Sequence, residues 1–282
     1  MKAVLNNRVE HEMLSLMCNI AYACVPAWYG AVRRNLEMDI VAPKEREGHA
    51  RLPLIIWICG GGFRCVSRST WLPQIMEFAR RGYVVASIEY RTANDAVLPD
   101  AYADVKSAIR YLKAHAAHYC IDPKRIAVMG ESGGGTLATF AGTTGGLPAF
   151  EKGDFTEYDS RVNAVVDFYG IADFNHNPVL VDGRDVPPFL VEDALGLNYK
   201  EADAARASVI SYISSDTPPF LIFHGNRDNR VPIEQSERLY RALTQAGVRV
   251  DFYEVDGGGH GDACFYQPDK LDIIDRFLRE VL

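Results

Sequence analysis

Positive charge is scarce in this chain: 30 lysine and arginine residues stand against 37 aspartate and glutamate residues, which gives a formal net charge of −7. The sequence has no basic cluster interleaved with aromatic residues, which is the electrostatic footprint of nucleic-acid binding. It also has no apolar run that approaches the length of a membrane span, no internal repeat and no low-complexity tract. These absences argue against a nucleic-acid partner and against a membrane partner.

Cysteine spacing excludes two further classes of protein. The six cysteines are scattered and show neither C-x-x-C spacing nor the frame of a small secreted domain. We therefore expect free thiols in a reducing compartment, no metal site and no other cofactor. These residues are Cys18, Cys24, Cys59, Cys65, Cys120 and Cys264.

The N-terminal segment from Met13 to Val25 is fairly apolar and ends in small residues, so that it superficially resembles a signal peptide. Glu10 and Glu12, however, stand where a signal peptide carries positive charge. The apolar residues also recur at helical spacing. We expect an amphipathic helix that covers the core, and cytoplasmic residence.

The remaining chain alternates between strand and helix patterns, which predicts a mainly parallel, doubly wound α/β sheet with helices on both faces. With 282 residues, 48% of them hydrophobic, the chain is long enough for one large domain spanning residues 1–282. Strands are predicted near residues 35–41, 54–59, 83–89, 125–130, 162–168, 219–224 and 249–255. Helices are predicted near residues 71–81, 100–117, 132–142, 234–246 and 269–281.

One interval, from Gly170 to Pro219, is too long for a simple crossover and carries several prolines. It includes a predicted short helix from Phe189 to Leu195. We interpret residues 171–215 as a small cap at the active-site edge, to which residues 1–30 also contribute; the alternative is a surface insertion without a role. The aromatic residues that are candidates to line the cap, or else to belong to the core, are Tyr169, Phe174, Phe189 and Tyr199.

A serine surrounded by glycines lies between a predicted strand and a predicted helix, in the run Gly130-Glu131-Ser132-Gly133-Gly134-Gly135. This pattern is typical of a nucleophile elbow, in which Gly130 and Gly134 stand where a Cβ would collide with neighbouring elements. The alternative is a phosphate-cradling turn, but the lysine of a phosphate-binding loop does not follow. We predict that Ser132 is a nucleophile.

Partners for Ser132 follow in the order acid, then histidine. Asp228 lies in the loop after the buried strand that ends at Phe223, and His260 lies in the flexible loop Gly257-Gly258-Gly259-His260-Gly261. We predict Asp228 as the orienting acid and His260 as the general base. The rival histidine is His224, at a strand end, where it fits better as a brace for the acid loop. The rival acids are Asp216, Asp256 and Asp262.

A third glycine-rich segment follows the apolar strand that ends at Ile58, in the run Cys59-Gly60-Gly61-Gly62. Glycines allow the backbone to turn its N–H groups inward, so we predict an oxyanion hole formed by the amides of Gly61, Gly62 and Gly133. The alternative is a simple strand-ending turn.

Together these segments resemble the α/β-hydrolase fold, and within it the carboxylesterase and lipase group with an HGGG-type oxyanion motif, including the bacterial acetyl and feruloyl esterases (BD-FAE-like). The resemblance extends from about Asp39 to the C-terminal helix. The chain departs from the pattern at Cys59, where the family carries a histidine; this leaves the chemistry in place but changes the polarity around the loop. We interpret Cys59 itself as an ordinary buried cysteine.

The resemblance implies a serine carboxylesterase that cleaves short-acyl esters of a small molecule or an oligosaccharide, such as acetyl or feruloyl esters of plant carbohydrate. Two alternatives stay open: a serine peptidase of the same fold and a non-catalytic, hydrolase-like binding protein. The sequence leaves homo-oligomerisation and the natural substrate open.

Overall fold

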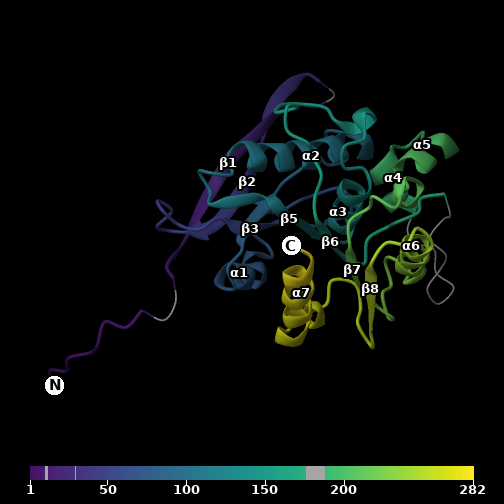
Figure 1. Ribbon diagram of the computed structural model, residues 1–282. Coiled ribbons are helices and arrows are strands. Elements are labelled where there is room, and N and C mark those ends of the chain that lie inside the picture. Colours follow the sequence, from purple (N-terminus) through teal and green to yellow (C-terminus); the bar gives the residue numbers. More distant parts are fainter. Residues whose placement is uncertain (10–11, 29, 176–187) are drawn as a thin grey trace.

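In the computed structural model, which describes residues 1–9, 12–28, 30–175 and 188–282, an eight-stranded sheet forms the centre of the molecule (Figure 1). The strand order is β1-β2-β4-β3-β5-β6-β7-β8. Strands β1, β2 and β4 pair antiparallel, and all other neighbours pair parallel. The strands are β1 (Leu14–Ala27), β2 (Val32–Pro43), β3 (Leu52–Ile58), β4 (Val84–Ile88), β5 (Ile121–Glu131), β6 (Ala164–Phe168), β7 (Phe220–Gly225) and β8 (Val250–Val255).

Helices cover both faces of this sheet. They are α1 (Leu72–Arg80), α2 (Leu98–Ala114), α3 (Gly133–Thr143), α4 (Pro188–Leu195), α5 (Glu201–Ala207), α6 (Glu234–Gln245) and α7 (Pro268–Val281). Short 3₁₀ turns lie at Pro148–Phe150, Val209–Tyr212 and Ala263–Tyr266. The predicted α/β class with a mainly parallel, doubly wound sheet is confirmed, and the predicted strands and helices from residue 35 onward are present with ends that differ by a few residues.

The two faces of the sheet have separate cores. Ile56 of β3 packs in the core under α2, α3 and α6, whereas Ile55 and Trp57 point to the opposite core under α1 and α7. This alternation follows from the two-residue period of a strand, and because both faces are covered, β3 is apolar along its length. Each large side chain removed from water in these cores stabilises the fold by about 1.5–3 kcal/mol.

The N-terminal segment corrects one prediction. Residues 14–27 form the edge strand β1, paired antiparallel with β2, and the predicted amphipathic helix over Met13–Val25 is wrong. The register shifts twice, between Met17 and Ile20 and between Ala21 and Ala23, with Asn19 at a φ of 57°. Such bulges interrupt the two-residue alternation of a strand, so the apolar residues fell at a helix-like spacing.

The interval after β6 contains the predicted short helix, observed as α4. Helix α4 supplies Leu190 to the pocket described below, and no described residue of 1–30 lines that pocket. The side chain of Phe189, one of the aromatic candidates, lies outside the part of the chain that the structure describes. No helix within the described ranges is both long enough and apolar enough to cross a membrane.

Candidate active site

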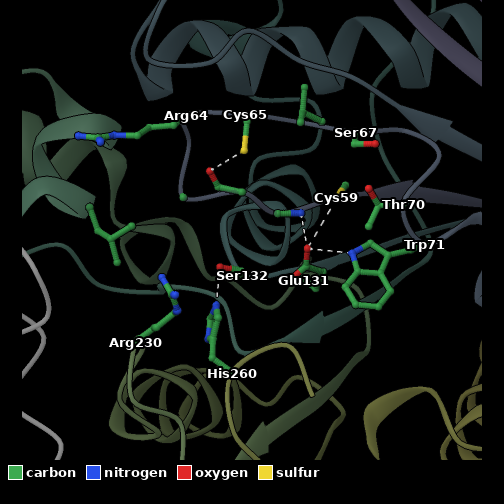
Figure 2. Close-up of a pocket in the computed structure, with 15 residues that line it drawn as sticks. Cys59, Arg64, Cys65, Ser67, Thr70, Trp71, Glu131, Ser132, Arg230 and His260 are labelled. Atoms are coloured by element: carbon green, nitrogen blue, oxygen red, sulfur yellow. Dashed lines mark hydrogen bonds between the residues drawn. The ribbon is translucent and has the colours of Figure 1, made fainter. Parts of the chain in front are cut away.

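Ser132 lies at the tight turn between β5 and α3 (Figure 2). Its backbone has a φ of 55°, a strained value for a residue with a side chain. A Cβ at Gly130 would lie 2.3 Å from the Gly134 carbonyl oxygen, and one at Gly134 would lie 2.0 Å from the Ile58 carbonyl oxygen. The predicted steric need for glycine at both positions is confirmed. The Ser132 amide also donates to the Phe168 carbonyl at 2.8 Å, which ties the turn to β6.

His260 lies between Ser132 and Asp228. Its Nδ1 atom is 2.6 Å from the Asp228 Oδ2 atom, and its Nε2 atom is 2.9 Å from the Ser132 Oγ atom. An ionised carboxylate can only accept, so Nδ1 carries the proton and donates to Asp228. In the neutral imidazole Nε2 then carries the lone pair and accepts the hydrogen bond of the Ser132 hydroxyl. This tautomer is the one required for proton removal from the serine.

Asp228 is held in an electrostatic environment that favours its charged form. Burial by itself raises the pKa of Asp228, but hydrogen bonds and charge from His224 and His260 hold that pKa well below its usual range. Its second oxygen, Oδ1, accepts the amides of Arg230 at 2.8 Å and Val231 at 2.9 Å. The carboxylate is therefore fixed in position and ionised at neutral pH.

The rival residues have other contacts. His224 is fully buried, lies 3.4 Å from Asp228, and donates through Nε2 to the Val231 carbonyl at 2.9 Å, so it braces the acid loop. Asp256 accepts from the Asn226 side chain at 3.0 Å, and Asp262 accepts from the Gly259 amide at 2.6 Å. Asp216 lies before β7, where its amide donates to the Ser214 hydroxyl.

The glycine loop after β3 lies in the same pocket as Ser132. Gly61 and Gly62 have φ values of 146° and 61°, in the region that favours glycine. Gly60 donates its amide to Glu131 at 2.6 Å, whereas the amides of Gly61 and Gly62 donate no hydrogen bond to any described residue. Gly133 is the first residue of α3, where an amide has no acceptor within its own helix. The three glycines predicted for the oxyanion hole therefore have backbone N–H groups without a hydrogen-bond acceptor among the described residues.

Glu131 holds this loop, a role that the sequence did not reveal. Its Oε1 atom accepts the Gly60 amide at 2.6 Å and the Trp71 indole N–H at 3.3 Å, and lies 3.8 Å from the Cys59 sulfur (Figure 2). Burial raises the pKa of Glu131, against the lowering effect of these donors and of His260. Burial and the neighbouring Glu131 raise the pKa of Cys59 to about 12, so that Cys59 remains a buried neutral thiol.

The pocket has a volume of about 500 Å³. Trp71 stands on one side of Ser132 and Arg230 on the other (Figure 2). Of the aromatic candidates, Tyr169 packs its ring 4.7 Å from the His260 ring, and Phe174 is buried against Phe63. Tyr199 is exposed and does not line this pocket.

Glu131, Trp71 and Arg230 are among the pocket residues that the sequence did not reveal. Glu131 was visible as the neighbour of Ser132 in the elbow, which is the one signal that pointed to it. No motif marks Trp71 or Arg230. In the described part of the chain, no group of three or more His, Cys, Asp or Glu side chains is arranged to hold a metal ion, and all six cysteines are free.

Comparison with known proteins finds esterases among the relatives of this chain. LipM of Mycobacterium tuberculosis, a probable carboxylic ester hydrolase, is 33% identical over 229 residues, which are 80% of this chain and 52% of that protein. The chain spans about half the length of the curated relatives it matches.

Solved structures extend the likeness to almost the whole chain. A truncated carbohydrate esterase from gut microbiota matches with a TM-score of 0.79 and 29% identity, covering 96% of this chain and 98% of that chain. Esterase 2 of Thermogutta terrifontis, phosphorylated by paraoxon, matches with a TM-score of 0.75 and 25% identity, covering 99% and 98%.

The BD-FAE family model matches residues 38–243, a stretch that includes Ser132 and Asp228. The fold, the relatives and this match agree, and the chain belongs to the BD-FAE family of α/β-hydrolase esterases.

Proposed function

We propose that this protein is a serine carboxylesterase that hydrolyses short-acyl esters, including acetyl or feruloyl esters of plant carbohydrate. The observation that carries the proposal is the placement of His260 between Asp228 and Ser132, with 2.6 Å and 2.9 Å contacts on its two ring nitrogens. The esterases among its relatives support the same reaction class.

The reaction proceeds in two steps. As the Ser132 Oγ atom attacks the ester carbonyl carbon, His260 Nε2 removes the hydroxyl proton, and Asp228 stabilises the imidazolium that results. The tetrahedral intermediate collapses when the C–O bond to the alcohol breaks and His260 returns the proton to the leaving oxygen. Water, deprotonated by His260, then attacks the acyl carbon, the bond from that carbon to the Ser132 Oγ atom breaks, and His260 returns the proton to Oγ as the acid is released.

The amides of Gly61, Gly62 and Gly133 stabilise the negative charge that forms on the carbonyl oxygen. Because this charge develops only in the transition state, such donors increase turnover more than they tighten substrate binding. Gly60 is excluded from this set, since its amide is already donated to Glu131.

A chromogenic short-acyl ester assay tests the proposal, with wild type compared with Ser132→Ala. We expect turnover by wild type and a loss of about 10⁴-fold or more in the variant. Turnover of peptide amides in preference to esters would favour the serine peptidase. Absence of turnover in both, with folded protein, would favour the hydrolase-like binding protein.

The cap is part of the same proposal. We propose that residues 171–215, of which 176–187 lie outside the described residues, form a cap on a single domain spanning residues 1–282. Leu190 of α4 supports this because its side chain lies against Gly62 in the pocket. A Cβ at Gly62 would approach the Leu190 Cδ2 atom to 3.1 Å. Replacement of Leu190 by alanine should therefore broaden the range of accepted esters, which a substrate panel measures.

A further inference from the structure

Arg230 is an exposed arginine whose side chain lines the pocket that contains Ser132 and His260 (Figure 2). Its backbone amide donates to the Asp228 Oδ1 atom at 2.8 Å, so its main chain is fixed directly to the proposed acid. The side chain is therefore attached at a defined place beside the reacting groups, and only its rotamers are free.

The charge of Arg230 has no partner within the described ranges. Its guanidinium makes no hydrogen bond and no ion pair with any residue there. The pocket's other arginine, Arg64, differs because it pairs with Asp193 of α4. A guanidinium stays charged at all accessible pH values and offers a planar set of donors that fits a carboxylate.

The acidic residue that lines the pocket, Glu131, does not lie beside Arg230. Glu131 is buried on the Trp71 side of Ser132, where Gly60 and Trp71 donate to it, whereas Arg230 stands on the opposite side (Figure 2). The pocket is therefore electrostatically asymmetric. A substrate with a negative group is favoured when that group lies toward Arg230.

From this arrangement we infer that Arg230 binds a carboxylate carried by the ester substrate, so that the preferred substrates are esters with a free carboxylate near the scissile bond. The inference rests on the proposed esterase function, since it names the substrate class of the same pocket. The carboxylate belongs either to the acyl group or to the alcohol, and the two sources are separated by the choice of probe.

The experiment compares kcat/KM for anionic esters with that for matched neutral esters. Nitrophenyl hemisuccinate against nitrophenyl valerate tests an acyl-side carboxylate, and meta-acetoxybenzoate against meta-acetoxybenzamide tests an alcohol-side carboxylate. We expect the anionic-to-neutral ratio for one pair to fall by about 10- to 100-fold in Arg230→Gln, because charge-assisted hydrogen bonds are lost. The change should appear in KM more than in kcat, and Arg230→Lys should restore part of it.

Arg227→Gln is the matched control, because Arg227 is an exposed arginine of the same loop that does not line the pocket. An unchanged ratio in Arg230→Gln for both pairs, or an equal fall in Arg227→Gln, would overturn the inference. Binding of meta-acetoxybenzoate to Ser132→Ala, measured by calorimetry, provides a readout without turnover. Binding that Arg230→Gln weakens in that background supports the anion site even if the esterase proposal fails, and binding that is indifferent to Arg230 contradicts it.

Discussion

The Oε1 atom of Glu131 lies 2.6 Å from the amide nitrogen of Gly60, which is 71 residues earlier in the chain. This contact joins the nucleophile turn to the glycine loop after β3, so the two segments that carry the proposed oxyanion donors are held by one carboxylate. Cys59 contributes only a weak thiol contact to the same oxygen, at 3.8 Å. The stronger support for the loop comes from Glu131.

Replacement of Glu131 by glutamine should lower kcat by about tenfold with little change in KM. An amide oxygen accepts a weaker hydrogen bond than a carboxylate, so the glycine loop is held less firmly where transition-state charge forms. Steady-state kinetics with a neutral ester measure the effect. Glu157→Gln, at an exposed acid outside the pocket, is the control. An unchanged kcat in a folded Glu131→Gln protein would contradict this role.

Replacement of Asp228 by asparagine should reduce turnover by about 10⁴-fold, because the asparagine amide favours the wrong tautomer of His260. Asp256→Asn and Asp262→Asn serve as controls, since their carboxylates bind Asn226 and Gly259 and not His260. Both control variants should be mildly affected. A loss in Asp262→Asn as large as that in Asp228→Asn would show that the acid is assigned wrongly.

The buried carboxyl group of Asp167, in β6, should make the free energy of unfolding depend on pH. Its complete burial raises its pKa to about 7, against the charge of His224 and the hydrogen bond from Gly170. Below the ordinary carboxyl pKa of about 4, both folded and unfolded chains carry the proton. As pH rises from about 4 to 7, the unfolded chain releases this proton while the folded chain keeps it. The free energy of unfolding therefore falls over this range.

Asp167→Asn should remove this fall in unfolding free energy, because an amide does not ionise. Relative to wild type, the variant should gain roughly 2 to 4 kcal/mol of unfolding free energy on going from pH 4 to pH 8. Urea unfolding at both pH values measures this difference. If the two proteins keep the same stability difference at both pH values, Asp167 is ionised in the folded protein at neutral pH and the pKa assignment is wrong.

The acyl chain length of the preferred ester should distinguish this protein from a lipase. Leu190 lines the pocket of about 500 Å³ and lies against the glycine loop, so we expect short acyl groups to be accepted better than long ones. Turnover over a ladder of nitrophenyl esters should fall from acetate or butyrate toward the long chains. A maximum at dodecanoate would instead reveal an extended acyl groove and a lipid substrate.

Much of the fold was predictable because buried parallel strands leave a strong pattern. The run from Leu54 to Ile58 is apolar throughout, since both faces of β3 are covered. The edge strand β1 was not predictable in the same way: one of its faces meets solvent, and bulges near Asn19 break its alternation. A helix and an irregular edge strand then give similar apolar spacing.

The candidate site also contains residues that the sequence predicts and residues that it does not. Ser132, Asp228 and His260 stand next to glycines and strand ends in a fixed chain order, and the structure brings the three together. The contact of Trp71 with Glu131 and the position of Arg230 in the pocket depend on how distant segments pack. No local pattern in the sequence encodes such contacts.

Covalent labelling with paraoxon tests the central claim, that Ser132 is an activated nucleophile, most directly. The related esterase 2 of Thermogutta terrifontis has been solved phosphorylated by this compound. We predict that wild type takes up one phosphoryl group per chain, that peptide mass mapping locates it on Ser132, and that esterase activity falls in proportion. Ser132→Ala should take up none. Labelling of another residue, with full activity retained when Ser132 is unmodified or replaced, would contradict the account.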